Sequence, residues 1–181
     1  GIEGKMAAVT WAREHKVPYL GICFGMQLAV IEFCRSQLGL AHAHSTELNA
    51  DCADPVVCLI DELKNGANEM KDLGGSMRLG AVTDDLAKGS QLHAIYRSSQ
   101  IVERHRHRYE VNPAYVERLE EAGMLVSARS QDSGFIDAVE ISDHPWFIAC
   151  QFHPEFHSKP LKPHPLFQSF LAAAKKHQSR S

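Results

Sequence analysis

The sequence predicts an α/β fold built around a central, mostly parallel sheet flanked by helices. Short apolar runs of strand length alternate with helical segments along the chain, and no internal repeat interrupts this order. The length of 181 residues is ordinary for one domain. We therefore expect residues 1–181 to form a single domain.

The alternation of strands and helices is clearest in the first part of the chain. Gly4 to Lys16 is expected to form a helix, because apolar residues recur at near-helical spacing and the segment ends on basic residues. Pro18 ends that helix, and Val17 to Ile22 is a short apolar run typical of a strand covered on both faces. The run Phe24 to Gln37 is apolar on nearly all sides, which predicts a buried helix. The local order is strand, tight turn and helix.

The rest of the chain is expected to alternate in the same way. After a strand at Pro55 to Ile60, glycines and polar residues from Asp61 to Ser76 indicate a long surface loop. Asn112 is a suitable N-cap and Pro113 suits a first helical turn, so a helix is predicted that ends at Gly123. Further strands are expected at Leu125–Ala128, Phe135–Ile141 and Trp146–Phe152, followed by a helix at Pro165–Lys176 and a frayed tail at His177–Ser181.

Composition disfavours several classes of protein. With 19 Lys plus Arg against 22 Asp plus Glu, the net charge of −3 argues against nucleic acid as the main partner. The longest charge-free apolar stretch, residues 17–31, is shorter than the roughly 20 residues of a membrane helix, so we expect no membrane span. Five scattered cysteines without a Cys-x-x-Cys pair disfavour both a disulfide framework and a zinc knuckle. No export signal is visible, and a reducing cytoplasm is the expected compartment.

The run Gly21-Ile22-Cys23-Phe24-Gly25 places a cysteine between the predicted strand and the predicted helix. Glycines on both sides suit a tight corner, because a side chain there would collide with neighbouring backbone. The corner also puts Cys23 beside the free amides of a helix N-terminus, which predicts a lowered cysteine pKa and an activated nucleophile. The alternative is that Cys23 is a small buried hydrophobic residue.

A thiolate that performs acyl transfer needs a base and a group that orients the base. His153-Pro154-Glu155 follows an apolar strand and supplies both groups. Residues two apart on an extended backbone point to the same side, so the Glu155 carboxylate is expected to reach one nitrogen of the His153 imidazole. A merely packed or solvated histidine is the alternative.

These two motifs resemble those of the triad (class I) glutamine amidotransferases, whose fold is a hydrolase-like and flavodoxin-like α/β sandwich. Further segments make the chain similar to the C-terminal glutaminase domains of the CTP synthase family over almost its whole length. The segments that carry this narrower resemblance are Ser45-Thr46-Glu47, Gly74 to Gly80, Glu103 to Asn112 with its Arg-His-Arg-His-Arg-Tyr run, and His144 to Phe147.

The resemblance implies that Cys23 attacks the side-chain amide of glutamine, that His153 carries the proton to departing ammonia, and that Glu155 orients the ring. The backbone N–H of Phe24 would be one oxyanion donor. The family takes its second donor from a Pro-Gly-Gly-Phe-Gly loop, which these 181 residues do not contain. If that loop is truly missing from the protein, weak activity is expected, since one such donor is typically worth ~10²–10³ in rate.

Glutamine is a zwitterion, so its site should offer an anion, a cation and polar contacts. By resemblance these are Glu47, Arg108 and Gln27, with backbone from Phe24 through Gly25 and Met26 lining the pocket. Glu47 as an ordinary surface acid and Gln27 as the polar face of its helix remain open as alternatives.

The run from Glu103 to Arg108 has a second interpretation, as a solvated basic strand that binds phosphate. A metal site at His105 and His107 is also conceivable, because alternate strand residues share a face. We expect no metal there, since neighbouring arginines would repel a cation and the sequence offers no evident third ligand.

No Gly-x-x-x-x-Gly-Lys-Ser/Thr phosphate loop is present, so no cofactor is expected in this domain. By resemblance, Mg-ATP, a GTP activator and a homotetramer belong mainly to an N-terminal synthase domain of the same polypeptide, and Asp61 to Gly80 is a candidate contact with it. Three alternatives to this function remain: another class I amidotransferase, a γ-glutamyl hydrolase, and a non-catalytic interaction module.

Overall fold

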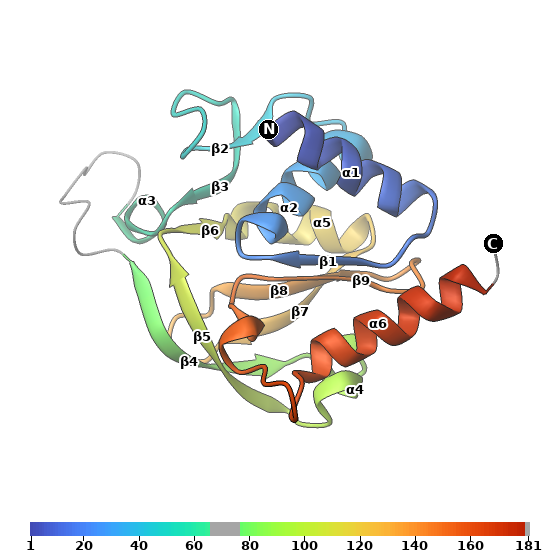
Figure 1. Ribbon diagram of the computed structural model, residues 1–181. Helices are drawn as coiled ribbons and strands as arrows, with labels where there is room; N and C mark the ends of the chain where they lie inside the picture. Colours follow the sequence, from blue (N-terminus) through green and yellow to red (C-terminus); the bar gives the residue numbers. More distant parts are fainter. Residues whose placement is uncertain (66–76, 180–181) are drawn as a thin grey trace.

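Two sheets organise the chain, in a computed structural model that describes residues 1–65 and 77–179 (Figure 1). The larger sheet has six strands in the order β1-β9-β8-β7-β4-β5, and the smaller has three in the order β2-β3-β6. The strands are β1 Tyr19–Ile22, β2 Ala43–Ser45, β3 Asp54–Leu59, β4 Arg78–Leu86, β5 Gln100–His107, β6 Tyr109–Val111, β7 Met124–Ser130, β8 Ile136–Ile141 and β9 Phe147–Cys150. The α-helices are α1 Ile2–Glu14, α2 Phe24–Gln37, α3 Ile60–Asn65, α4 Gln91–Tyr96, α5 Val116–Glu121 and α6 Pro165–Gln178.

The α/β class is confirmed, but the large sheet is mixed rather than mostly parallel. Among its described pairs only β1 with β9 is parallel, and the others are antiparallel. The reason is visible in the connections: residues 131–135 join β7 to β8, and residues 142–146 join β8 to β9. Such turns are too short for the crossover of a dozen or more residues that a parallel pair requires.

Helices cover both faces of the large sheet (Figure 1). Helices α1, α2 and α5 contribute to one apolar cluster, whereas α4 and α6 contribute to the other. The strands serve both clusters by alternation: Val139 and Ala149 belong to the first, and Ala138 and Ile148 to the second. This two-sided burial explains why the sequences of β1 and β9 are continuous apolar runs.

The helix predicted from Asn112 begins as expected but is divided. The Asn112 side chain accepts a hydrogen bond from the amide of Ala114 at 3.0 Å. A 3₁₀ turn over Pro113–Tyr115 then leads into α5, and Gly123 follows with a φ of 100°, a value that favours glycine.

The middle of the chain departs most from the sequence prediction. Helix α3 occupies the start of the segment expected to be a loop, and the rest of that segment, residues 66–76, lies outside the described residues. The proposed contact surface at Asp61 to Gly80 is therefore described only at its two ends. Strands β2, β4 and β6 and helix α4 had no counterpart in the prediction, and β5 was foreseen only in the interpretation of Glu103 to Arg108 as a basic strand.

The helices of the described part fall short of what a membrane crossing requires in length and apolar content. The longest, α2 and α6, have 14 residues each. A bilayer span needs about 20 apolar residues.

Gly21 lies where strand β1 and helix α2 approach each other most closely. A Cβ at this position would stand 2.9 Å from both the carbonyl carbon and the oxygen of Gly25, and 2.9 Å from Cε1 of Tyr19. Two of these three atoms belong to the backbone, so the contact cannot be relieved by a side-chain rotation. The sequence prediction of a glycine-dependent corner is confirmed at Gly21. It is wrong at Gly25, where an added Cβ would meet only the Tyr19 hydroxyl at 3.7 Å, an ordinary contact.

We expect Gly21→Ala to lower the free energy of unfolding by about 2 kcal/mol or more, because it overpacks a backbone contact. The matched control is Gly4→Ala within α1, where an added Cβ meets nothing within 4 Å. Gly4 is the third residue of α1, so that change should raise the free energy of unfolding by at most about 1 kcal/mol, since alanine has a higher helix propensity than glycine. Urea unfolding of both variants checks the pair, and equal stabilities would contradict the prediction.

Candidate active site

Cys23 occupies a strained corner between β1 and α2. Its backbone has φ 52° and ψ −106°, a conformation that a residue with a Cβ rarely adopts. The Cys23 amide donates to the carbonyl of Cys150 at 2.7 Å, and the Tyr19 hydroxyl donates to the carbonyl of Gly25 at 2.9 Å. A cysteine on such a strand-to-helix turn has the geometry of a nucleophile elbow.

The parallel pairing of β1 with β9 brings the second motif to the same edge of the sheet. Ile22 pairs with Cys150, so Cys23 and the residues after Cys150 leave the sheet side by side. His153 is held there through its amide, which donates to the carbonyl of Arg104 in β5 at 2.8 Å. Residues 130 positions apart in the chain thereby become neighbours at one end of two strands.

His153 and Glu155 form a close pair. Nδ1 of His153 lies 2.6 Å from Oε1 of Glu155. Because an ionised carboxylate only accepts hydrogen bonds, this contact places the ring proton on Nδ1. Nε2 of His153 is then the proton acceptor, and it is buried with no hydrogen-bond partner in the described part of the chain.

The expected lowering of the Cys23 pKa is wrong for the protein without substrate. Burial raises the pKa of the Cys23 thiol, and the negative charges of Glu155 and Glu47 act in the same direction. The backbone amide of Phe24 and the side chain of Gln151 lower the pKa, but by less than burial raises it. The amide at the helix N-terminus therefore lowers the pKa of Cys23 as predicted, but desolvation raises that pKa by more.

A cleft of about 400 Å³ opens beside Cys23. It brings together the three side chains that the resemblance assigned to the substrate site and also Phe24, although these residues come from three separate segments. Glu47 follows β2, Phe24 and Gln27 belong to α2, and Arg108 lies between β5 and β6. The lining residues are Cys23, Phe24, Gln27, Glu47, Leu48, Met77, Arg106, His107, Arg108 and Tyr109.

Two residues expected to line the pocket through their backbone do not line this cleft. Met26 is fully buried in the core, and Gly25 packs against Tyr19. Phe24 and Gln27 reach the cleft from one face of α2 because they are three apart, whereas the side chain of Met26 is buried in the core and the carbonyl of Gly25 accepts a hydrogen bond from Tyr19. His153 and Glu155 are likewise absent from the lining.

Gln151 is the site residue that sequence reasoning missed. It is fully buried, and its Nε2 donates to Sγ of Cys23 over 3.6 Å. A signal was present, because Gln151 and His153 are two apart after a strand and so tend to face the same side.

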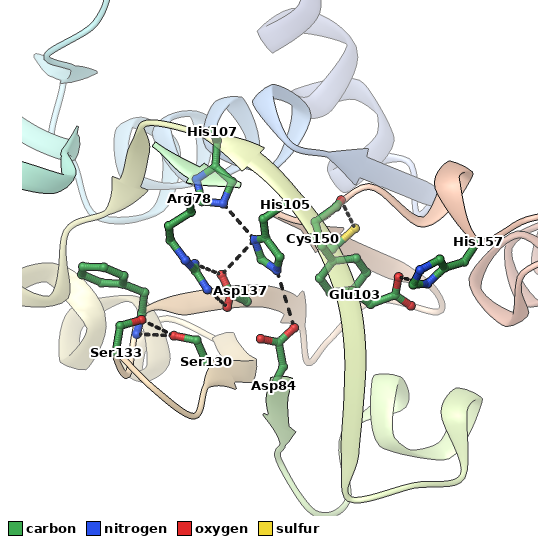
Figure 2. A network of polar contacts seen from close by, with 12 residues as sticks. Arg78, Asp84, Glu103, His105, His107, Ser130, Ser133, Asp137, Cys150 and His157 are labelled. Atoms are coloured by element: carbon green, nitrogen blue, oxygen red, sulfur yellow. Dashed lines mark hydrogen bonds and ion pairs between the residues drawn. The ribbon is translucent and has the colours of Figure 1, made fainter. Parts of the chain in front are cut away.

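The histidines of β5 belong to a buried polar network beneath the cleft (Figure 2). Nδ1 of His105 and Nε2 of His107 are 2.9 Å apart, and Asp137 of β8 offers an oxygen close to both. Asp137 is therefore a possible third metal ligand that was not evident from the sequence. However, Arg78 binds both oxygens of Asp137, at 2.6 and 2.8 Å, and its positive charge opposes a cation. This donor set fits a metal poorly.

The cation beside these histidines is not one of the arginines named from the sequence. Arg104 and Arg106 lie on the exposed face of β5, where Arg106 also lines the cleft, whereas the cation on the buried face is Arg78 of β4. Arg78 also pairs with Glu110 at 2.9 Å. Asp84 completes the network, and neither of its buried oxygens has a hydrogen-bond partner among the described residues.

Comparison with known proteins agrees with this geometry. The family described as Glutamine amidotransferase class-I matches residues 1–173, and the chain belongs to that family. It is similar to the glutaminase domain of Trypanosoma brucei CTPS with bound acivicin, at 42% identity and a TM-score of 0.89, covering 97% of this chain and 67% of that one.

More distant structures share the fold. A putative GMP synthase protein from Thermoplasma acidophilum matches 98% of this chain and 67% of its own length, at 16% identity and a TM-score of 0.59. A glutamine amido transferase from Methylobacillus flagellatus matches 83% of this chain and 43% of its own, at 15% identity and a TM-score of 0.51.

Burial raises the pKa of Asp84 to about 6. In the unfolded chain this carboxyl ionises near pH 4. The free energy of unfolding therefore falls as the pH rises from about 4 to about 6, and above that range the loss stays constant. We expect Asp84→Asn to remove this loss, raising the melting temperature by several degrees at pH 8 and leaving it nearly unchanged at pH 4.

The matched control is Asp85→Asn, one residue along β4 with an exposed side chain. It should not reproduce the pH dependence. Thermal unfolding of both variants at the two pH values measures the effect. A gain at pH 4 as large as the gain at pH 8 would contradict the ionisation argument.

Proposed function

We propose that this chain hydrolyses L-glutamine through a thioester on Cys23 and acts as the glutaminase domain of a CTP synthase. The observation that carries the proposal is the corner geometry of Cys23, at the same sheet edge as the His153–Glu155 pair and open to a cleft with Glu47 and Arg108. Membership of the class I amidotransferase family supports the same chemistry.

The proposed reaction has two halves. Sγ of Cys23 attacks the side-chain amide carbon of glutamine while the thiol proton passes through Nε2 of His153 to the departing nitrogen, which leaves as ammonia. Water then attacks the thioester, releasing glutamate and returning the proton to the sulfur. Because burial raises the pKa of the Cys23 thiol, little thiolate is present before the attack, and Nε2 of His153 would accept the proton. The amide of Phe24 would donate to the developing oxyanion.

Charge complementarity would orient the substrate. Glu47 offers a carboxylate for the α-ammonium group, and Arg108 offers a guanidinium for the α-carboxylate. Gln27 lines the same cleft, and its Oε1 is buried without a hydrogen-bond partner in the described part of the chain.

In the full enzyme, the ammonia would aminate UTP to CTP at the expense of ATP. Identity of 42% over 97% of the chain to a CTPS glutaminase domain supports this assignment. We further propose that the full enzyme has an N-terminal synthase domain that binds Mg-ATP, that GTP activates it, and that it forms a homotetramer. We propose no cofactor for the described residues.

We expect Cys23→Ala to reduce ammonia release from glutamine by more than ~10³-fold, because no other group can form the thioester. His153→Ala should be nearly as severe. Glu155→Ala should cost less, about 10–100-fold, since it removes orientation of the ring and leaves the base in place. A coupled glutamate assay measures all three variants, and a fully active Cys23→Ala protein would remove the enzymatic assignment.

Two further measurements separate the alternatives. The glutamine analogue acivicin should label Cys23, and failure of labelling in a folded protein would favour a non-catalytic module. Faster turnover of a γ-glutamyl peptide than of free glutamine would indicate a γ-glutamyl hydrolase. Glutamine- and ATP-dependent formation of CTP from UTP would separate a CTP synthase from other amidotransferases.

We expect Arg108→Ala to raise the KM for glutamine about 10–100-fold with a smaller change in kcat, because a charged hydrogen bond to the substrate is lost. The matched control is Arg104→Ala, whose side chain is exposed on the outer face of β5. Steady-state kinetics should show the control close to wild type. An unchanged KM in Arg108→Ala would remove that residue from the site.

A further inference from the structure

Gln151 connects the nucleophile to the cleft wall through a buried chain of side-chain amides. Its Nε2 lies 3.6 Å from Sγ of Cys23, and its Oε1 lies 3.3 Å from Nε2 of Gln27. Nε2 of Gln27 in turn lies 3.2 Å from the carbonyl oxygen of Tyr109. Gln151 has no exposed surface and Gln27 is only 3% exposed, so water does not compete for these contacts.

The backbone determines the direction of this chain. The carbonyl of Tyr109 can only accept a hydrogen bond, so the group of Gln27 that faces it must be the NH₂. The second N–H of that NH₂ requires an acceptor, which places Oε1 of Gln151 toward Gln27. The NH₂ of Gln151 is then left facing Sγ of Cys23. A reversed Gln151 would set two NH₂ groups against each other.

The sulfur of Cys23 therefore receives an N–H from Gln151. A thiolate accepts such a bond far better than a neutral thiol, so the contact favours the ionised form. The backbone amide of Phe24 also lowers the pKa of the Cys23 thiol, and by more than Gln151 does, whereas Glu47 and Glu155 carry negative charges that oppose ionisation of Cys23. The thiol of Cys150 stays protonated because burial raises its pKa well above the usual value. His153 holds its ring proton toward Glu155, away from the base nitrogen.

We propose that Gln151 is a positioning residue that holds the sulfur of Cys23 and stabilises its thiolate, with its orientation set by the Tyr109 carbonyl through Gln27. The inference rests on the proposed function in assigning Cys23 as the nucleophile. It adds a donor that acts on the nucleophile itself, distinct from the groups that bind substrate.

The test is the pH dependence of iodoacetamide alkylation of Cys23 without glutamine, followed by mass spectrometry of the peptide that carries it. Gln151→Met keeps the length of the side chain and removes the donor. We expect its apparent pKa for alkylation to rise by about one unit, so that alkylation at pH 7 is about tenfold slower while the rate at high pH is unchanged. A wild-type midpoint in folded Gln151→Met would overturn the proposal.

Two more variants test the hydrogen bonds from Tyr109 through Gln27 to Gln151 and control for a folding defect. Gln27→Leu leaves Gln151 in place but frees its amide to turn, so a smaller rise of the same midpoint is expected. Gln37→Met makes the same change as Gln151→Met at an exposed position near the end of α2, and should alkylate like wild type. A shift in Gln151→Met without any shift in Gln27→Leu would overturn the role of Tyr109 and Gln27.

Steady-state kinetics separate this proposal from the proposed function. In an active protein, Gln151→Met should lower kcat for glutamine and leave KM nearly unchanged, because the lost contact is to sulfur. A wild-type protein that releases no ammonia would overturn the proposed function, while the alkylation midpoints would still decide the role of Gln151. A rise in KM alone would place Gln151 in substrate binding and overturn the positioning role.

Discussion

The pairing of β1 with β9 is the contact on which the candidate site depends. It is the one parallel pair in the described part of the large sheet, and it ends with the Cys23 amide donating to the Cys150 carbonyl at 2.7 Å. Through it a cysteine and a histidine far apart in sequence leave the sheet at the same edge. The strained backbone of Cys23 is maintained because this hydrogen bond and the packing of Gly21 on Gly25 hold both sides of the turn.

Burial at this corner has opposite consequences for binding and for reactivity. A partly enclosed cleft strengthens the charge–charge contacts that would orient a zwitterionic substrate. The same desolvation raises the pKa of the Cys23 thiol and so reduces the thiolate present before substrate binds. Three features offset part of this cost: the amide of Phe24, the side-chain amide of Gln151, and Nε2 of His153, which has no hydrogen-bond partner among the described residues. Each supplies a donor to the thiolate or an acceptor for its proton.

The buried network below the cleft shows how one wall of the site is supported. His107 lines the cleft and also contacts His105, which lies among Asp137, Arg78 and Asp84 (Figure 2). Arg78 of β4 links this group to β8 and β6. Because the network ties together strands from both sheets, the position of the cleft-lining residues at the end of β5 depends on contacts well outside the cleft.

The sequence by itself determined the strand, turn and helix around Cys23, the His153–Glu155 pair and the family, because each depends on residues adjacent in the chain. Tertiary structure decided the mixed sheet and the strand β4, whose residues have no clear apolar alternation. It also decided which of the helix residues after Cys23 reach the cleft. The ionisation of Cys23 could not be predicted either, since its direction follows from the balance of burial against hydrogen bonds. Desolvation depends on what covers a group, and only the folded chain specifies that cover.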